Sequence, residues 1–330
     1  MTIVRSIDVG YSHTKFTVSG SEKDVRCRIF PSLAPLASRL ALSRGMGTAR
    51  DTMRIAVGGA EYEVGPDVRL GLKAHHTRIL NDHYIRTPEY LALVRGALSA
   101  MHVAVIDALV VGLPVQLMGS HAQELVERLQ GVHPVGDGRS VDVRHVLTLA
   151  QPLGGFFHYA MGAGAYETSG DCMTLVVDPG YCTLDWLSAL GVKVMAERSG
   201  SVPGGVHVLV EEMARGVSET LDVGYHDFDA IDRALIKGQS LMVGGREISL
   251  SQYEARVKAR TEEAVNALVN SVGNGLDISR IVVVGGGATL YAPALRTRFP
   301  HHTVTVTPDP MFANVRGFQL IGEQYTAVGV

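Results

Sequence analysis

Two short stretches combine an acid, a glycine and small polar residues in an order that suits phosphate chemistry. They read IDVGYSHTKF, residues 7–16, and VVDPGYCTLDW, residues 176–186. In each stretch an apolar run ends on an acid, Asp8 or Asp178, and a glycine follows two positions later. The pattern predicts a hairpin of two strands joined by a tight glycine turn, whose backbone N–H groups can approach a phosphate.

The acid of each hairpin cannot hold a phosphate directly. It can hold a hydrated divalent cation that binds the phosphates, or it can orient an attacking water. Lys15 adds a cation that can neutralise phosphate charge, and Thr14 corresponds to Thr183 with an offset of one residue. Two such hairpins, about half a chain apart, would form the two jaws of one nucleotide clamp.

Three further segments accompany the hairpins in a fixed order. AQPLGGFFHYAMG, residues 150–162, lies between the hairpins and predicts a helix rich in small residues. RIVVVGGGATL, residues 280–290, is a buried strand that ends in three glycines, and DPMFANVRGFQLIG, residues 309–322, follows it. A single acid–glycine turn is usually an ordinary β-turn, so the prediction rests on the ordered set.

The elements that must position these residues alternate between strands and helices. Apolar, β-branched runs predict strands in IVRSIDV, MRIAVGG, IDALVVGLPV, CMTLVVDPG, KVMAERS and RIVVVGGGA. Helical spacing is present in TPEYLALVRGALSAMHV, capped by Thr87, in VHVLVEEMARGVSETL, and in SQYEARVKARTEEAVNALVNSVGNGL, capped by Ser251 and closed near Gly273 and Gly275. This alternation predicts an α/β chain, with ALSRGMGTARDT and KGQSLMVGGREISL as small subdomain segments or loops.

Size and charge narrow the class of protein. The chain has 330 residues, 46% hydrophobic, which is enough for two domains with sizeable cores. Its formal net charge is −3, so it is no generic binder of polyanions. The arginines between Arg26 and Arg54 are scattered and favour a solvated face.

Cysteine usage and hydropathy indicate a cytoplasmic protein. The three cysteines, Cys27, Cys172 and Cys182, form no CxxC pair and are expected to be structural core residues in a reducing compartment. No apolar run reaches the roughly 18 residues that a membrane span requires. The N-terminus MTIVRSIDVG leads directly into a strand pattern and has no signal-peptide layout.

Several local motifs suggest other chemistry but lack the necessary context. The pairs His75-His76 and His301-His302 do not have metal-ligand spacing. SHTK, residues 12–15, matches the SxxK of serine enzymes without its partner motifs, and it reads as a strand turn. GAGAYE, residues 162–167, begins like a dinucleotide fingerprint but lacks the third glycine and precedes a strand. No GxxxxGK[ST] loop is present.

Taken together, the five segments resemble the actin-like ATPase superfamily, which includes actin, chaperone ATPases and sugar kinases. They span residues 7 to about 322, and the closing FANVRGFQLIG most resembles plasmid-segregation actins of the ParM/StbA type. The resemblance implies an α/β, actin-like (ribonuclease H-like) two-domain fold with a central nucleotide cleft, and ATP and Mg²⁺ as cofactors.

The resemblance also assigns roles to individual positions. Asp8 and Asp178 match the two loop acids that handle Mg²⁺, mostly through water. Gln151 matches a water-orienting Gln or Glu, and Asp8, Gln151 and Asp178 are therefore the expected catalytic residues. The expected nucleotide-binding residues are Gly10, Tyr11, Ser12, His13, Thr14 and Lys15 in the first phosphate loop, Gly180, Tyr181, Cys182 and Thr183 in the second, with Asp185 on the following strand, Gly204 and Gly205 at a helix start, and Gly285, Gly286, Gly287 and Ala288 in the adenosine loop.

Two positions qualify this assignment. Plasmid actins often have Glu where this chain has Gln151, whereas conventional actin has Gln, so an orienting role is expected rather than general-base action. The second loop reads DPGYCT, and Pro179 removes one backbone donor. Tyr181 and Cys182 are bulky beside a phosphate, which predicts a different phosphate pose or slower hydrolysis.

The resemblance places the domain boundaries as well. Domain I is expected at residues 1–158 plus 312–330, and domain II at residues 159–311. Smaller outer subdomains are expected at about 30–85 and about 206–275.

The leading functional hypothesis is an ATPase that assembles head to tail into ATP-dependent filaments. Its cargo would be plasmid DNA, held through a DNA-binding adaptor protein at a plasmid centromere, without direct nucleic-acid or membrane contact. One alternative is a small-molecule kinase or phosphatase of the same superfamily. Another is a nucleotide-dependent regulatory protein that does not polymerise. The fold alone does not separate them.

Overall fold

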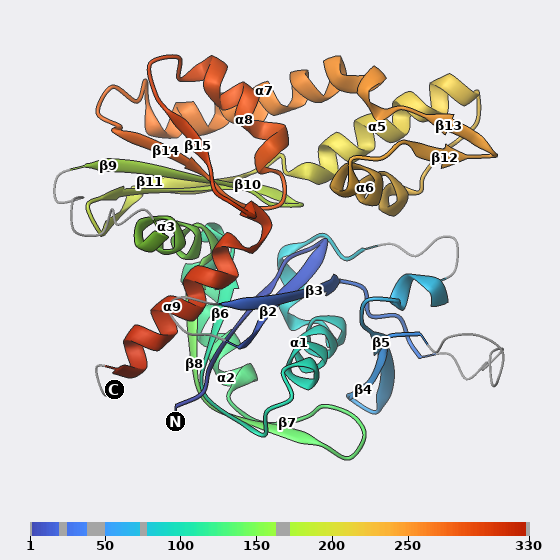
Figure 1. The fold of residues 1–330 in the computed structure, drawn as a ribbon, viewed down its shortest axis with the longest axis vertical. Coiled ribbons are helices and arrows are strands. Elements are labelled where there is room, and N and C mark those ends of the chain that lie inside the picture. Colours follow the sequence, from blue (N-terminus) through green and yellow to red (C-terminus); the bar gives the residue numbers. More distant parts are fainter. Residues whose placement is uncertain (1, 20–24, 38–49, 73–77, 163–171, 328–330) are drawn as a thin grey trace. The chain divides into compact units, whose positions relative to one another are not determined.

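The computed structural model describes residues 2–19, 25–37, 50–72, 78–162 and 172–327. The chain divides into two compact units, Met1–Thr168 with Thr307–Val330, and Ser169–Val306. The sequence places the corresponding boundaries at 158/159 and 311/312. Figure 1 shows the elements of each unit coloured along the chain. No helix in the described ranges is both long and apolar enough to cross a membrane.

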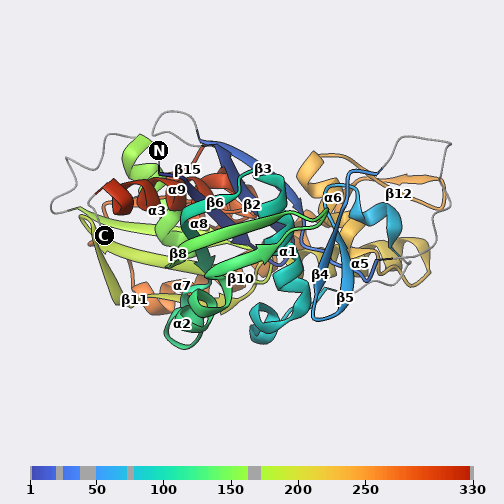
Figure 2. The ribbon, with the colours of Figure 1, turned by 90° about the horizontal axis from the view of Figure 1, so that it is seen from below.

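A six-stranded sheet forms the centre of the first unit, with the strand order β3-β2-β1-β6-β8-β7. β1, β2 and β3 pair antiparallel, β6 and β8 continue in parallel, and β7 closes the edge antiparallel. A separate antiparallel hairpin, β4–β5, lies beside α1, as Figure 2 shows. The strands of this unit are β1 (Val4–Val9), β2 (His13–Ser19), β3 (Arg26–Pro31), β4 (Met53–Val57), β5 (Ala60–Val64), β6 (Val105–Leu113), β7 (Gly131–Pro134) and β8 (Ser140–Ala150).

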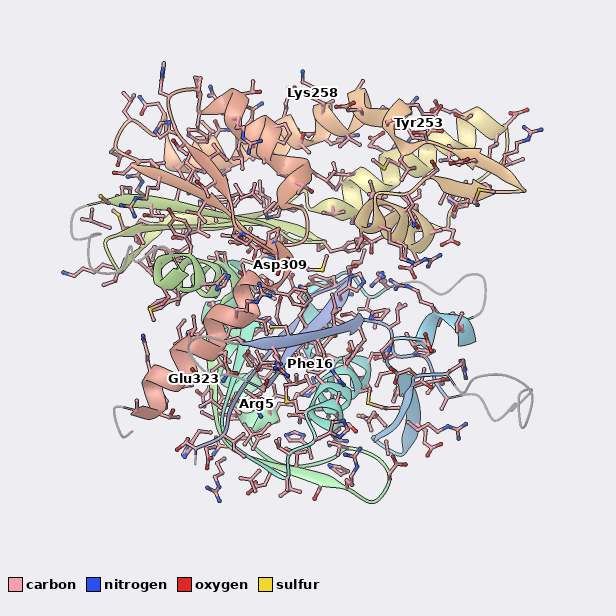
Figure 3. All side chains as sticks on the ribbon, viewed as in Figure 1. Arg5, Phe16, Tyr253, Lys258, Asp309 and Glu323 are labelled. Atoms are coloured by element: carbon pink, nitrogen blue, oxygen red, sulfur yellow. The ribbon has the colours of Figure 1, made fainter. Side chains whose placement is uncertain are left out.

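Helices cover both faces of this sheet, because alternate residues of a strand point to opposite sides. Ile7 of β1 packs in the core that α1 and α2 complete, together with Phe16, which is labelled in Figure 3. Ser6, on the other face, donates its hydroxyl to the carbonyl of Val315 in α9. The helices of this unit are α1 (Pro88–Ala100), α2 (Met118–Leu129), α3 (Gln151–Gly162) and α9 (Ala313–Ala327), with 3-10 turns η1 (Val68–Gly71), η2 (Asp82–Arg86), η3 (Val115–Leu117) and η5 (Pro310–Phe312).

Helices α3 and α9 touch through their backbones. A Cβ added to Gly317 of α9 would stand 1.8 Å from the carbonyl oxygen of Gly154 in α3. Only glycine permits that approach, so this contact fixes the place of α3, the helix that Gln151 begins.

A five-stranded sheet forms the centre of the second unit, with the strand order β11-β10-β9-β14-β15. β9, β10 and β11 pair antiparallel, and β14 and β15 continue in parallel from β9. The two large sheets thus share one plan, an antiparallel three-strand meander joined to parallel strands. The elements are β9 (Met173–Pro179), β10 (Thr183–Leu190), β11 (Lys193–Pro203), α5 (Val206–Leu221), α6 (Phe228–Lys237), β12 (Leu241–Val243), β13 (Arg246–Ile248), η4 (Leu250–Tyr253), α7 (Glu254–Val272), β14 (Arg280–Val283), α8 (Ala288–Arg298) and β15 (Val304–Val306).

The predicted α/β class is confirmed, and most predicted elements form. Thr87 caps α1, since its hydroxyl accepts the amide of Tyr90. The predicted Ser251 cap is wrong: Ser251 lies in η4, its hydroxyl bonds that of Ser249, and α7 begins after Tyr253. Gly273 does end α7, at a φ of 81°.

Other expectations are corrected or lie outside the described ranges. KGQSLMVGGREISL contains the small hairpin β12–β13. The three cysteines are free and partly buried, so the expectation of core cysteines is wrong. Most of ALSRGMGTARDT and GAGAYE, and the pair at 75–76, lie outside the described residues.

Candidate functional site

The first hairpin joins β1 to β2 through Gly10, Tyr11 and Ser12. The amide of Gly10 donates to the carbonyl of His13 over 3.1 Å and closes the turn. A Cβ on Gly10 would stand 3.2 Å from that carbonyl and 3.3 Å from Nζ of Lys15. The glycine therefore lets the turn and the lysine amino group come close together.

Asp8, Lys15 and Gln151 meet at the base of this hairpin. Asp8 is 1% exposed and lies opposite Lys15 in the β1–β2 register. Nζ of Lys15 is 2.9 Å from Oδ2 of Asp8, and Nε2 of Gln151 donates to Oδ1 over 2.7 Å. The buried carboxylate is thus compensated by a cation and an amide donor. Because the nitrogen of Gln151 faces Asp8, its amide oxygen points away and can accept a hydrogen bond from a water.

Arg78, which the sequence analysis did not single out, holds the tip of this hairpin. Its Nη1 donates to the carbonyls of Tyr11 and Ser12 over 2.8 and 2.7 Å. The carbonyl of Ser12 also accepts the amide of Ser32 over 2.8 Å. In sequence, Arg78 is one of many scattered arginines, so no signal distinguished it.

The other tip residues are anchored to the same unit. The hydroxyl of Tyr11 donates to the carbonyl of Asn81, and its ring stacks on Tyr84 at a centroid distance of 5.2 Å. Thr14 is fully buried, and its hydroxyl bonds that of Ser32 over 2.9 Å. The side chain of Thr14 therefore supports the hairpin from inside.

His13 lies at this tip with cationic side chains nearby. Burial lowers its pKa well below the usual range, and the nearby charges of Arg69, Arg78 and Lys15 lower it further. Its Nδ1 lies 2.8 Å from the Ser12 hydroxyl. Three cationic side chains thus act on one hairpin tip, which favours an anionic ligand there.

The second hairpin, between β9 and β10, repeats the backbone of the first. The amide of Gly180 donates to the carbonyl of Thr183 over 2.9 Å, as Gly10 does to His13. Asp178 lies opposite Asp185 in register, where Asp8 lies opposite Lys15. The sequence paired Thr183 with Thr14 at an offset of one residue. In the structure Thr183 is equivalent to His13, and the two hairpins align without an offset.

The acid of the second hairpin packs against the glycine segment before α8. Asp178 is 4% exposed, and a Cβ on Gly285, at a φ of 79°, would stand 1.9 Å from its Oδ1. The amide of Gly287 donates to the carbonyl of Pro179 over 2.9 Å. Gly286 is exposed and Ala288 is buried at the first position of α8. The predicted adenosine loop and second phosphate loop therefore adjoin within one unit.

The start of α5 holds the tip carbonyls of the second hairpin. The amides of Gly204 and Gly205 donate to the carbonyl of Cys182, at 3.3 and 3.1 Å. The amides of Val206 and His207 donate to the carbonyls of Gly180 and Tyr181, at 3.0 and 2.7 Å. The first amides of a helix lack partners within the helix, and here the hairpin supplies them.

The side chains of this tip are braced as well. The ring of Tyr181 lies 5.4 Å from that of His207, which meets Phe228 edge-on. Thr183 donates its hydroxyl to Asp185. Cys182 is partly buried. Both tip tyrosines thus pack inward in their own unit.

The donor chemistry of both acids fits the Mg²⁺ that the resemblance implies. Mg²⁺ prefers oxygen ligands, keeps several waters and is bound through one or two carboxylates. Asp8 and Asp178 each offer a buried carboxylate beside a hairpin of backbone amides. Within its own unit, each is a carboxylate that would hold such a cation through its water shell.

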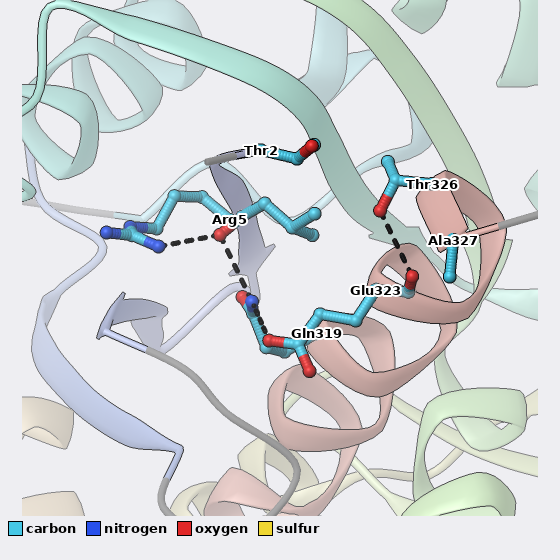
Figure 4. A pocket seen from close by; sticks show the side chains of 7 residues that line it. Thr2, Arg5, Gln319, Glu323, Thr326 and Ala327 are labelled. Atoms are coloured by element: carbon cyan, nitrogen blue, oxygen red, sulfur yellow. Dashed lines mark hydrogen bonds between the residues drawn. The ribbon is translucent and has the colours of Figure 1, made fainter. Parts of the chain in front are cut away.

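A small pocket in the first unit lies between the start of β1 and the end of α9 (Figure 4). Gln319 joins it to the first hairpin: its Oε1 accepts from the hydroxyl of Thr17 in β2 over 2.7 Å, and its Nε2 donates to the Val4 carbonyl and to Glu323. This network attaches α9 to both hairpin strands. The pocket is lined by Thr2, Val4, Arg5, Gln319, Glu323, Thr326 and Ala327.

Solved structures with the same fold include an archaeal actin homologue and ParM proteins. Ta0583, an archaeal actin homologue, is 19% identical, with 98% of this chain and 100% of that chain covered at a TM-score of 0.78, and its complex with ADP matches at 0.77 with the same identity and coverage. A non-polymerisable quadruple mutant of pCBH ParM is 17% identical over 98% and 100% of the chains at 0.78. A 15-stranded ParM filament from Clostridium botulinum is 17% identical over the same shares at 0.75.

Family models match both halves of the chain. The model for the N-terminal domain of actin-like proteins matches residues 6–154, and the model for the C-terminal part of the archaeal MreB-like actin homologue matches residues 176–297. No curated protein matches the chain by sequence. The first matched range contains Asp8, β2 and Gln151, and the second contains Asp178, β10 and the glycine segment before α8. The chain therefore belongs to the actin-like superfamily.

Proposed function

We propose that this protein is an ATPase that assembles into ATP-dependent filaments. The observation that carries the proposal is the pair of matching hairpins, each with a buried acid beside a glycine turn. In both hairpins a donor from the same unit holds the tip carbonyls, so that the backbone amides can face a phosphate. The ADP complex of Ta0583 supports a nucleotide as the ligand.

The two hairpins would divide the work on the nucleotide. The amides of residues 10–15 and 180–183, with the ammonium of Lys15, would bind the β- and γ-phosphates. Gly204 and Gly205 at the start of α5, and Gly285, Gly286, Gly287 and Ala288 before and in α8, would line the nucleoside. Bound Mg²⁺ supplies charge neutralisation at the phosphates.

Gln151 would orient the attacking water. Its amide nitrogen is engaged by Asp8, which leaves the oxygen to accept a proton of the water in a hydrogen bond. An amide takes up no proton at neutral pH, so positioning is the whole contribution. Asp8 and Asp178 would complete the site through the water shell of the cation.

The support for self-association comes from similar structures and not from the geometry of the nucleotide site. The similar structures include a ParM filament and a non-polymerisable mutant of a ParM protein. A head-to-tail contact that does not close generates a filament. The proposed cargo is plasmid DNA held through an adaptor protein, and the net charge of −3 agrees with indirect rather than direct DNA contact. The cysteine usage favours the cytoplasm.

Light scattering after addition of Mg-ATP, with phosphate release followed in parallel, tests the proposal. We expect scattering to rise and then to decay as phosphate appears. Phosphate release with flat scattering would contradict the filament, and a screen of hydroxyl-bearing small molecules would then test the kinase alternative. Absence of both signals would contradict the ATPase itself.

Two variants test the assigned residues. Gln151→Ala is expected to slow turnover by about 10- to 100-fold, because the water loses its orienting acceptor, and to lengthen polymer lifetime. Asp178→Ala is expected to lower hydrolysis while leaving some nucleotide binding. Normal phosphate release from both would mean that the chemistry lies on other residues.

A further inference from the structure

Arg78 uses a single nitrogen to hold two consecutive carbonyls. Nη1 lies 2.8 Å from the oxygen of Tyr11 and 2.7 Å from that of Ser12. This nitrogen carries two hydrogens, so it can donate one to each carbonyl. Hydrogen bonds from a charged donor are stronger than neutral ones, and these two fix the orientation of two peptide groups at the hairpin tip.

The orientation of those carbonyls decides where the neighbouring amides point. In a trans peptide the C=O and N–H groups point in opposite directions, and the described residues contain no cis peptide bond. The peptide groups that join Tyr11 to Ser12 and Ser12 to His13 direct their carbonyls at Arg78. The N–H groups of Ser12 and His13 therefore point away from Arg78, and successive N–H groups directed to one side form a concavity that binds anions.

The second hairpin provides an internal comparison. Its corresponding carbonyls, those of Tyr181 and Cys182, are also held from one side, by the amides of His207, Gly204 and Gly205. Both hairpins thus have their tip carbonyls engaged by donors of their own unit. In the second the donors are backbone groups at the start of α5. In the first a side chain, Arg78, holds both carbonyls, and the backbone amide of Ser32 adds a second donor to that of Ser12.

From this geometry we infer that Arg78 is a positioning residue for the first phosphate hairpin. It orients the amides of Ser12 and His13 toward the terminal phosphates of the nucleotide without contacting the reacting atoms itself. The inference rests on the proposed nucleotide site, and it assigns to an arginine side chain the work that the α5 backbone does in the second hairpin.

The test compares Arg78→Ala and Arg78→Lys in the full chain by two measurements. Titration calorimetry with Mg-ATP is expected to give a Kd about tenfold or more higher for Arg78→Ala than for the wild type. Arg78→Lys is expected to recover most of the lost affinity, because one ammonium can donate to both carbonyls. Hydrogen exchange without nucleotide is expected to be faster in peptides covering residues 9–14 of Arg78→Ala and unchanged in those covering 173–190. If Arg78 acted on ATP only through its positive charge, its removal would not change hydrogen exchange in the absence of nucleotide.

Arg95→Ala is the matched control. Arg95 also donates from Nη1 to a backbone carbonyl of the first unit, that of Ala56 in β4 over 2.6 Å, away from the hairpin. It is expected to leave both the Kd and the exchange of residues 9–14 unchanged. Should Arg78→Ala not fold, Arg78→Met, which keeps the apolar stem, takes its place.

The outcomes separate this inference from the proposed function. Wild-type binding of Mg-ATP together with an unchanged Kd and unchanged exchange in Arg78→Ala would overturn the inference and leave the proposed function standing. A wild-type protein that binds no Mg-ATP would overturn the proposed function, and the role of Arg78 with it.

Discussion

The two hairpins of this protein have the same backbone and different supports. In both, a glycine amide closes the turn on the residue three positions ahead, and a buried acid precedes the glycine by two positions. The first hairpin relies on side chains, Arg78 at its tip and Lys15 with Gln151 at its acid. The second relies on the backbone of two helix starts, those of α5 and α8.

This difference shows how one local structure can be held in place in two ways. Backbone support needs glycines where chains approach closely, and it is independent of side-chain identity elsewhere. Side-chain support introduces charge, so the first hairpin carries Lys15, Arg69 and Arg78 around His13. The first hairpin is therefore expected to respond to charge and pH, and the second to respond to added volume.

The largest effect is expected where the two hairpins differ in charge. Lys15→Met leaves the buried Asp8 carboxylate without its cation and is expected to lower the free energy of unfolding by about 3 kcal/mol. Asp185→Asn, at the corresponding position of the second hairpin, keeps an oxygen that can accept from Thr183 and is expected to cost less than about 1 kcal/mol. Urea unfolding followed by circular dichroism measures both.

Lys258→Met is the control for removal of a lysine charge. Its side chain is 70% exposed, with Glu262 3.9 Å away, and it lies on the outside of α7 in Figure 3. Its expected effect is close to zero. Equal costs for Lys15→Met and Asp185→Asn would show that charge does not distinguish the hairpins.

A smaller effect is expected from added volume at the second hairpin. A Cβ in Gly205→Ala would stand 2.6 Å from the carbonyl oxygens of both Gly180 and Tyr181. Pushing α5 away from the hairpin is expected to cost about 1–3 kcal/mol and to weaken nucleotide binding. Fluorescence of Trp186, the one tryptophan of the chain and a residue of β10, reports unfolding near the change.

The control for this change is an open glycine. Gly119→Ala lies in α2, where a Cβ would meet nothing within 4 Å, and it is expected to be neutral or slightly stabilising. If Gly205→Ala behaved in the same way, the contact between α5 and the hairpin would not be what holds the tip.

The smallest effect is expected from pH, and only in the first hairpin. Because the folded chain keeps the pKa of His13 low, the unfolded chain takes up the proton first as the pH falls below about 6.5. Because of His13, the free energy of unfolding therefore falls by up to about 1.4 kcal/mol for each pH unit below this point. His13→Asn is expected to lose less stability than the wild type between pH 7 and pH 5.5, measured by urea unfolding.

Other histidines set the background of this measurement. Burial also lowers the pKa of His133 and His158, and both contribute equally to wild type and variant. His301→Asn, at an exposed position, is the control and should follow the wild type. A His13→Asn profile that matched the wild type would place the acid sensitivity outside the first hairpin.

Much of the fold could be predicted because local patterns and tertiary structure agree. The hairpin β1–β2, the hairpin β9–β10, the helices α1, α3 and α5 and the strand before Gly285 all lie where apolar periodicity and turn residues place them. The Ser251 cap was wrong because a 3-10 turn took the residues that would have formed the first turn of the helix. A cap is decided by one or two hydrogen bonds, which neighbouring structure easily overrides.

The candidate site was predictable in its glycines and acids but not in its supports. Asp8, Lys15 and Gln151 are 143 residues apart at their extremes, and the structure brings them together at one carboxylate. Lys15 pairs with the acid of the first hairpin, and Asp185 pairs with the acid of the second. Only the strand register shows that these two residues occupy equivalent positions. Arg78 carried no local signal, because a bond to a backbone carbonyl requires no particular partner residue.

The sequence by itself determined the class of the fold, the two hairpins and the order of the segments around them. These features depend on periodicity, turn chemistry and spacing, which act between near neighbours in the chain. Only the tertiary structure decided which donors hold the hairpin tips, since those hydrogen bonds join residues 20 to 70 positions apart. Such contacts arise from the packing of whole elements, and the backbone carbonyls that accept them are the same at every residue.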